Sequence, residues 1–122
     1  MTPESVVRAF CHAVERRDVA ILVEFFTADA VYHNIPLAPL TGREAIAETL
    51  GQFIAPASKV EFEIRGLAAQ GATVFTERVD RFEIGGKLVA LPVMGAFEVT
   101  PDGKISAWRD YFDMQQFTRQ LG

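Results

Sequence analysis

The sequence predicts an α+β fold in which N-terminal helices pack over the concave face of a cone-shaped, curved, mixed or antiparallel sheet and enclose an apolar pocket. Three observations predict it. Apolar residues in the first half of the chain recur at helical spacing, and after Pro56 the spacing changes to two, as in strands. Glycine- and proline-containing turns separate the later strands. Helices followed by a run of strands are typical of the α+β class.

Composition restricts the class of protein further. A chain of 122 residues suits one domain, residues 1–122, and 49% hydrophobic residues exclude disorder. The net charge of −4 argues against nucleic acid or an anionic membrane as a partner. Cys11 is the only cysteine, and the segment after Met1 lacks the basic and apolar regions of a signal peptide. We therefore expect a cytoplasmic protein without a disulfide.

Three helices are expected before the sheet. The first spans Thr2–Arg16, with threonine as N-cap and proline at the first helical position. The second spans Asp18–Asp29, with an aspartate cap and an apolar side. The third starts at the Thr41–Glu44 segment, which matches a capping box, and stops before Pro56.

One short strand interrupts the helical half. Residues Ala30–Asn34 are predicted to be extended, and Leu37–Leu40 is proline-interrupted and apolar, so it is expected to be an ordered loop. This strand carries Tyr32 and Asn34 on one side, because residues two apart in a strand share a face.

The second half of the chain is predicted to be a meander of four strands. The first contains alternating apolar residues near Phe62 and ends at a glycine turn. The next two, Thr73–Ile84 and Lys87–Val99, flank the hairpin signal Gly85-Gly86. Proline and glycine at positions 92 and 95 suggest a bend or bulge in the second of these strands. The last strand, Lys104–Phe112, leads into a short terminal helix.

The strand Thr73–Ile84 places charged groups on an inward face. Arg78 and Asp80 share one face of this strand with large apolar residues. Asp110 likewise shares a face with Trp108 and Phe112 on the last strand. A buried carboxylate or guanidinium is costly unless it is paired and hydrogen-bonded. Two acids and an arginine aimed into an apolar interior therefore indicate either a structural ion-pair network or a catalytic site.

The expected pocket has polar groups on one side and apolar walls elsewhere. Its predicted walls are Leu37, Phe82, Met94, Trp108 and Phe112, with Leu91 and, as an alternative to Phe82, Phe75. The two histidines, His12 and His33, show no metal-ligand spacing, so no metal site is predicted.

Three stretches, taken together in this order, resemble the limonene-1,2-epoxide hydrolase family of the nuclear transport factor 2-like superfamily. They are Val31–Leu37, Thr76–Asp80, and Gly103–Ile105 with Trp108–Asp113. The superfamily also contains isomerases, cyclases and non-catalytic binders, so the fold alone does not choose a function.

The resemblance implies a site made of Tyr32, Asn34, Arg78, Asp80 and Asp110. Tyrosine, asparagine and Asp110 would hold a water that attacks an epoxide, with Asp110 as base. Asp80 would protonate the epoxide oxygen, and Arg78 would bridge the two acids. No cofactor or metal is implied, and the substrate would be a small apolar epoxide that becomes a diol.

Two alternatives remain open at the level of sequence. One is an isomerase of the same fold that moves a proton next to a carbonyl, with Tyr32 as an oxyanion donor. The other is a non-catalytic binding domain whose charges are structural. The presence of Asn34 beside Tyr32 favours hydrolysis, because a nucleophilic water needs several holders.

We also expect a homodimer. The sheet face opposite the pocket is predicted to expose four apolar side chains, and an exposed apolar area of this kind usually marks an interface. These side chains are Phe75, Val79, Val93 and Phe97.

Overall fold

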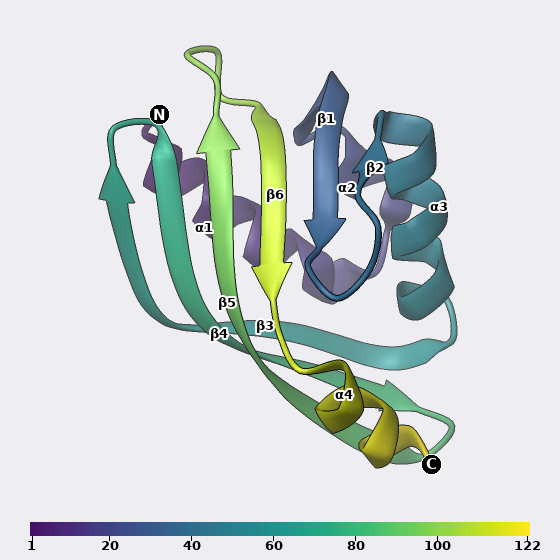
Figure 1. Ribbon diagram of the computed structural model, residues 1–122. Helices are drawn as coiled ribbons and strands as arrows, with labels where there is room; N and C mark the ends of the chain where they lie inside the picture. Colours follow the sequence, from purple (N-terminus) through teal and green to yellow (C-terminus); the bar gives the residue numbers. More distant parts are fainter.

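A computed structural model describes residues 1–122 and contains one curved, mixed six-stranded sheet with the order β2-β1-β6-β5-β4-β3 (Figure 1). The elements are α1 (Pro3–Ala13), a 3-10 turn η1 (Val14–Arg16), α2 (Val19–Val23), β1 (Phe26–Asn34), β2 (Leu40–Thr41), α3 (Arg43–Ile54), β3 (Ala57–Gln70), β4 (Thr73–Ile84), β5 (Lys87–Val99), β6 (Ile105–Tyr111) and α4 (Met114–Leu121). Strand β1 runs parallel to β6, and the other neighbours are antiparallel. The predicted α+β class is confirmed. None of the helices has the length and apolar character that a membrane crossing requires.

Helix α1 begins as the sequence predicts and covers the concave face of the sheet. The Thr2 hydroxyl accepts a hydrogen bond from the Ser5 backbone N–H, and the Ser5 hydroxyl accepts one from the Thr2 N–H. One side of the helix is buried, and its Phe10 ring packs edge-on against the rings of Phe97 and Trp108. The helix therefore lies behind the sheet in Figure 1, against β5 and β6.

The second predicted helix is too long. Helix α2 ends at Val23, and strand β1 has begun by Phe26. Phe26 pairs with Ile105 at the start of β6, and Ile105 donates its N–H to the Phe25 carbonyl. This pairing with a distant strand outweighs the helical spacing of the local apolar residues.

The predicted capping box of the third helix is also wrong. Thr41 belongs to β2, where it pairs with Val31, and the N-cap of α3 is Gly42, without a side-chain hydrogen bond. The expected loop before this helix therefore ends in a short strand. The end of α3 at Ile54, before Pro56, agrees with the prediction.

Strands β4 and β5 form a long hairpin with continuous pairing. The register runs from Thr73 opposite Glu98 to Ile84 opposite Lys87 without a shift. Gly85 and Gly86 make the turn with φ values of 57° and 79°, a region that favours glycine. The bulge expected near residues 92–95 does not interrupt this ladder, and β5 curves gradually instead (Figure 1).

The continuous register corrects the predicted faces of β5. Alternation holds along the strand, so Val93 and Phe97 are buried on the concave side, whereas Met94 is 52% exposed on the outer side. Val93 and Phe97 were predicted to face outward and Met94 to line the pocket; all three predictions are wrong. The register of β5 with β4 has no shift, so the simple alternation of an extended strand decides these three directions.

Helix α4 closes the end of the sheet where β3, β4 and β5 extend beyond β6 (Figure 1). Asp113 caps it by accepting hydrogen bonds from the N–H groups of Gln115 and Gln116. The Gln120 amide then bonds both backbone groups of Ala90, accepting at 2.8 Å and donating at 2.9 Å. This side chain therefore occupies part of the β5 edge that β6 leaves free.

Candidate active site

Strand alternation on β4 and β6 brings the predicted charged residues together on the concave face. Arg78, Asp80 and Asp110 are 1%, 4% and 4% exposed. Thr76, the neighbour of Arg78 on the same face of β4, is also buried. Charged side chains this deeply buried require partners, and each of these has them.

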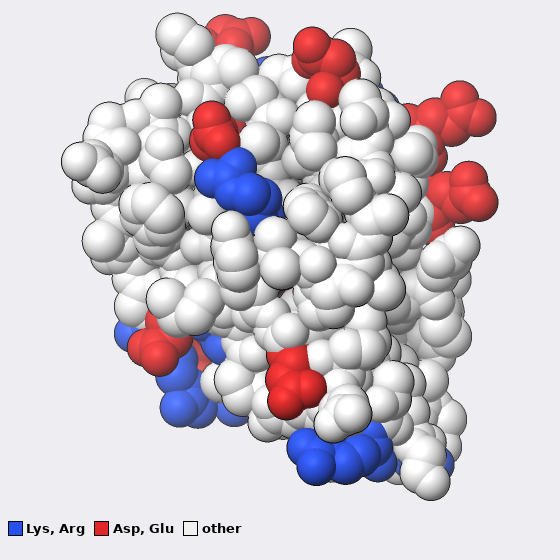
Figure 2. Space-filling model, in the orientation of Figure 1, with Lys and Arg blue, Asp and Glu red and all other residues white.

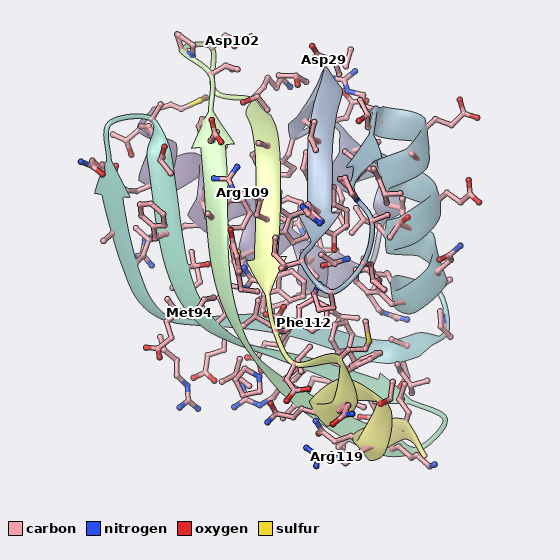
Figure 3. The ribbon with its side chains drawn as sticks, viewed as in Figure 1. Asp29, Met94, Asp102, Arg109, Phe112 and Arg119 are labelled. Atoms are coloured by element: carbon pink, nitrogen blue, oxygen red, sulfur yellow. The ribbon has the colours of Figure 1, made fainter.

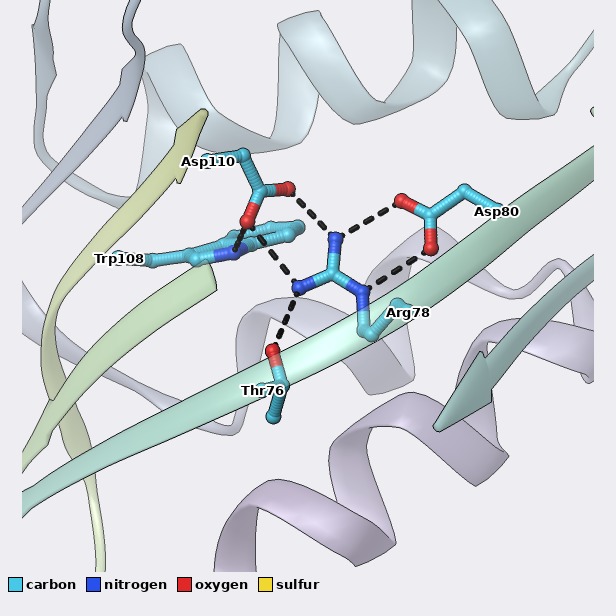
Figure 4. Close-up of polar contacts among 5 residues, drawn as sticks. All are labelled: Thr76, Arg78, Asp80, Trp108 and Asp110. Carbon is cyan, nitrogen blue, oxygen red and sulfur yellow. Dashed lines mark hydrogen bonds and ion pairs between the residues drawn. The ribbon is translucent and has the colours of Figure 1, made fainter. Parts of the chain in front are cut away.

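The Arg78 guanidinium makes five hydrogen bonds and so uses all its N–H donors (Figure 4). Its Nε and Nη2 donate to Asp80 Oδ1 and Oδ2 at 3.0 and 2.8 Å. Its Nη1 and Nη2 donate to Asp110 Oδ1 and Oδ2 at 3.1 and 2.8 Å. The last donor of Nη1 reaches the Thr76 hydroxyl at 3.2 Å. The arginine bridges the two carboxyl groups, each through two oxygens.

The parallel pairing of β1 with β6 places the other two predicted residues beside this triad. Tyr32 lies opposite Trp108 in the register, and Asn34 lies opposite Asp110. The Tyr32 ring stacks on the Trp108 ring with centroids 4.2 Å apart and planes 10° apart. The Trp108 indole Nε1 donates to Asp110 Oδ1 at 2.7 Å. All five residues proposed from the sequence therefore meet in one place.

A pocket of about 400 Å³ lies against this cluster. Tyr32, Asn34, Asp80 and Asp110 contribute polar groups to its lining. Most of the remaining lining is apolar: Leu37, Phe53, Pro56, Phe62, Phe82, Ile84, Leu91, Val93, Phe112, Met114, Phe117 and Leu121. Such a cavity, with few polar groups and apolar walls, is typical of a small-molecule site.

The predicted walls are partly correct. Leu37, Phe82 and Phe112 line the pocket, and Phe112 lies where β6 leads into α4 (Figure 3). Met94 does not line it, because it points to the other side of β5. Trp108 does not line it either: it is fully buried beneath Tyr32, in contact with the core.

Several residues of the site were not found from the sequence. Gly95 of β5 lies opposite both Thr76 and Asp110, and a Cβ built on it would lie 2.4 Å from Arg78 Nη1. The glycine is therefore required by the guanidinium and not by a bend. Thr49 and Gln52, three residues apart on α3, add polar groups to the pocket wall. Only the regular spacing of these two residues on one helix side could have indicated them.

Burial raises the pKa of two acidic groups of the site, Asp80 and Tyr32. Loss of solvent raises the pKa of Asp80 to about 6, against the opposing attraction of Arg78. Burial, reinforced by the charge of Asp110, raises the pKa of Tyr32 well above its usual range. With one proton on its two carboxyl groups, the cluster of Arg78, Asp80 and Asp110 has no net charge, which is the least costly state for a buried site. No three His, Cys, Asp or Glu side chains are grouped as a metal site would require.

This arrangement places two carboxyl groups, joined by one arginine, at the wall of one apolar pocket, and burial raises the pKa of one of them, Asp80. Two carboxyl groups that differ in proton affinity are what concerted general acid–base catalysis requires. The sequence profile of the limonene-1,2-epoxide hydrolase catalytic domain matches residues 1–122. The chain belongs to the limonene-1,2-epoxide hydrolase family.

Relatives within and around this family have similar sequences and structures. Epoxide hydrolase EphG of Mycobacterium tuberculosis (strain ATCC 25618 / H37Rv) is 35% identical over 117 residues, which cover 94% of this chain and 76% of EphG. The solved structure of an LEH-like epoxide hydrolase from M. tuberculosis is 35% identical, with a TM-score of 0.79 over 96% of this chain and 86% of that one.

The fold is shared more widely than the sequence. The epoxide hydrolase/cyclase-like enzyme SalBIII, studied for pyran ring formation in the polyether salinomycin, has a TM-score of 0.85 at 23% identity. The superposition covers 93% of this chain and 92% of SalBIII. At that identity the similarity shows the fold, so the limonene-1,2-epoxide hydrolase family assignment rests on the sequence profile and on EphG.

Proposed function

We propose that this protein is a cofactor-independent epoxide hydrolase that adds water in one step to a small, largely apolar epoxide and releases a vicinal diol. The observation that carries the proposal is the Arg78 bridge between Asp80 and Asp110, because both acids also reach the pocket. Membership of the family and the similarity to EphG support the reaction class.

The proposed step uses the two acids in opposite directions. A water held by Tyr32, Asn34 and Asp110 gives a proton to Asp110, while its oxygen forms a bond to one epoxide carbon. The carbon–oxygen bond of the ring breaks, and the released oxygen takes the proton of Asp80. Asp80 is then ionised and Asp110 neutral, and exchange with solvent restores the starting state after the diol leaves.

The chemistry of an epoxide explains why such a pair is needed. The ring is strained but neutral, and its oxygen would leave as an alkoxide unless it were protonated during opening. An acid whose pKa is raised by burial can supply that proton near neutral pH. The apolar walls suit a hydrocarbon skeleton and exclude bulk water from the reacting atoms.

A substrate panel tests the reaction class. Purified protein is incubated with terpene, cyclic meso and styrene-type epoxides, and diol is measured against an enzyme-free blank. We expect diol from at least one class, with Asp110→Asn as the inactive control. Failure of every class to give diol above the blank would contradict the proposal.

The route of oxygen tests the one-step mechanism. The reaction is a single turnover with excess enzyme in water labelled with a heavy oxygen isotope. Direct attack by water places the labelled oxygen in the diol and none in the protein. If an aspartate attacked first, the first diol would carry an unlabelled carboxylate oxygen. Unlabelled diol, or label in a peptide containing Asp80 or Asp110, would disprove direct attack while leaving the hydrolase assignment intact.

We further propose that the protein forms a homodimer through the outer face of the sheet. This face is mostly uncharged in Figure 2, and it exposes Phe75, Met94 and Tyr111, which are 42%, 52% and 48% exposed. Arg109 also lies there (Figure 3), paired with Glu98 at 2.6 Å. A second copy would bury this apolar area.

Light scattering tests the dimer. We expect a dimer at micromolar concentration, and dissociation when Phe75 and Met94 are both changed to Glu. The control is Ile21→Glu, at an exposed apolar residue of α2 on the helical side of the molecule. A monomeric wild-type protein would rule this assembly out.

A further inference from the structure

Trp108 contacts two members of the site without reaching the pocket. It is the only tryptophan of the chain and is fully buried. Its Nε1 donates to Asp110 Oδ1 at 2.7 Å, and its ring stacks on the Tyr32 ring at 4.2 Å. A residue needed for packing alone would not have to direct its single donor at a site carboxylate.

The hydrogen bonds to Asp110 distinguish its two oxygens (Figure 4). Oδ1 accepts from Arg78 Nη1 at 3.1 Å and from Trp108 at 2.7 Å, whereas Oδ2 accepts only from Arg78 Nη2 at 2.8 Å. A carboxylate oxygen offers about two acceptor positions. A Cβ on Gly95 would lie 2.9 Å from Oδ1, so the backbone of β5 also restricts access to this oxygen. Oδ2 is therefore the oxygen of Asp110 with an open position.

Asp80 has no corresponding neutral donor. Its Oδ1 and Oδ2 each accept one hydrogen bond, and both come from Arg78. Asp110 thus receives three N–H donors and Asp80 two. Hydrogen bonds donated to a carboxylate stabilise its ionised form, so the additional donor favours ionisation of Asp110 over Asp80.

We propose that Trp108 is a positioning residue that selects Asp110 as the base and directs the transferred proton to Oδ2. The consequence for catalysis rests on the proposed epoxide hydrolysis. One O–H bond of water breaks and its proton binds Oδ2, while the water oxygen bonds to carbon, the ring C–O bond breaks, and the ring oxygen takes the proton of Asp80. Trp108 keeps its own proton, and its stacking holds the Tyr32 ring beside the same water.

Four ionisable groups interact electrostatically with Asp110: Arg78 and Asp80 from β4, Tyr32 from β1 and Cys11 from α1. Burial raises the pKa of Cys11 to about 12 and that of Tyr32 far above its usual range, so both stay neutral at physiological pH. Asp80, whose pKa burial raises to about 6, is then the only one of the three neighbouring acidic groups that changes its charge near neutral pH.

The single indole gives a test that needs no substrate. Trp108 contributes one indole ¹H–¹⁵N signal to the NMR spectrum of the intact protein, and an N–H bonded to a carboxylate is shifted downfield. We expect Asp110→Asn to move this signal upfield and Asp80→Asn to leave it close to its wild-type position. An indole signal that does not respond to Asp110→Asn, or that responds equally to Asp80→Asn, would overturn the proposal.

A variant tests the catalytic consequence. Trp108→Phe keeps an aromatic ring against Tyr32 but removes the indole N–H that donates to Asp110. The midpoint of the acidic limb in the pH profile of kcat/KM should therefore shift to higher pH, by about one pH unit. The control is Phe26→Leu. Phe26 is buried with its ring centroid 6.1 Å from that of Trp108, and it makes no hydrogen bond to either acid. It should reduce stability and leave the limb unchanged.

The outcomes of these experiments distinguish the role proposed for Trp108 from the proposed epoxide hydrolase function. An acidic limb that is the same in folded Trp108→Phe and wild type, or an equal shift in Phe26→Leu, would show that the indole only packs. If Trp108→Phe does not fold, the indole signals of the two aspartate variants decide. If the wild type opens no epoxide, the proposed function fails, while the indole signal still reports whether Trp108 distinguishes the two acids.

Discussion

Gly95 and Arg78 lie so close that no side chain fits between them. A Cβ on Gly95 would lie 2.4 Å from Arg78 Nη1 and 2.8 Å from the Thr76 hydroxyl. The guanidinium of β4 thus lies over the bare backbone of β5, which is where it bridges the two aspartates. The conformation of the glycine is ordinary, so the requirement is one of space.

We expect Gly95→Ala to reduce both activity and stability. The methyl group must displace the guanidinium, at a cost of about 1–3 kcal/mol for overpacking, and the bridge between the acids is distorted. Chemical denaturation and diol formation measure the two effects. The control is Gly66→Ala on β3, where the nearest atom to a new Cβ is 4.0 Å away. Equal behaviour of the two variants would contradict a steric role for Gly95.

Asp80→Asn and Asp110→Asn should each abolish nearly all diol formation. In the proposed mechanism the first variant loses the proton donor and the second loses the base, while both keep the size of the side chain. Circular dichroism should show that the fold is retained, and diol is measured at saturating epoxide. Turnover close to wild type by either folded variant would refute the role assigned to that acid.

Arg78→Lys should lose most activity although the charge is kept. Lysine has no planar fork, so it cannot bond two carboxyl groups through five donors. Breaking a buried ion pair costs about 3–5 kcal/mol, and part of this loss should appear in urea denaturation. A lysine variant as active as wild type would show that the bridge is not required.

The rate should decrease as the pH rises above about 6. Burial raises the pKa of Asp80 to about 6, so above that pH the free enzyme progressively loses the proton that the proposed mechanism transfers to the epoxide oxygen. The measurement is the pH profile of kcat/KM after subtraction of the uncatalysed reaction. A rate that stays constant through this range and falls only at strongly alkaline pH would exclude Asp80 as the acid.

Stability should also fall as pH rises toward 6. The Asp80 pKa is raised from 3.8 to about 6 on folding, so the folded state binds this proton more tightly than the unfolded state. Its contribution is fully present below the unfolded pKa and is lost as the pH passes through the folded pKa, a change of roughly a few kcal/mol. Comparing the free energy of unfolding of wild type and Asp80→Asn from pH 4 to 7 isolates this contribution. Parallel curves would show that the group does not titrate in this way.

The sequence by itself determined the direction of the charged residues on β4. The bounds Thr73–Ile84 and the inward face that holds Arg78 and Asp80 follow from alternation between two turns. Alternation is a local property of an extended chain, so a single sequence is enough to read it. The same reasoning correctly placed Tyr32 and Asn34 together on one side of β1.

Contacts between distant segments decided the rest. Strand β1 begins at Phe26 because that residue pairs with Ile105, and Met94 faces outward because β5 pairs with β4 without a bulge. The need for a glycine at position 95 and the hydrogen bond from Trp108 to Asp110 depend on which side chain of the neighbouring strand lies opposite. Register across strands is set by the packing of the whole sheet, and local spacing in the chain does not contain it.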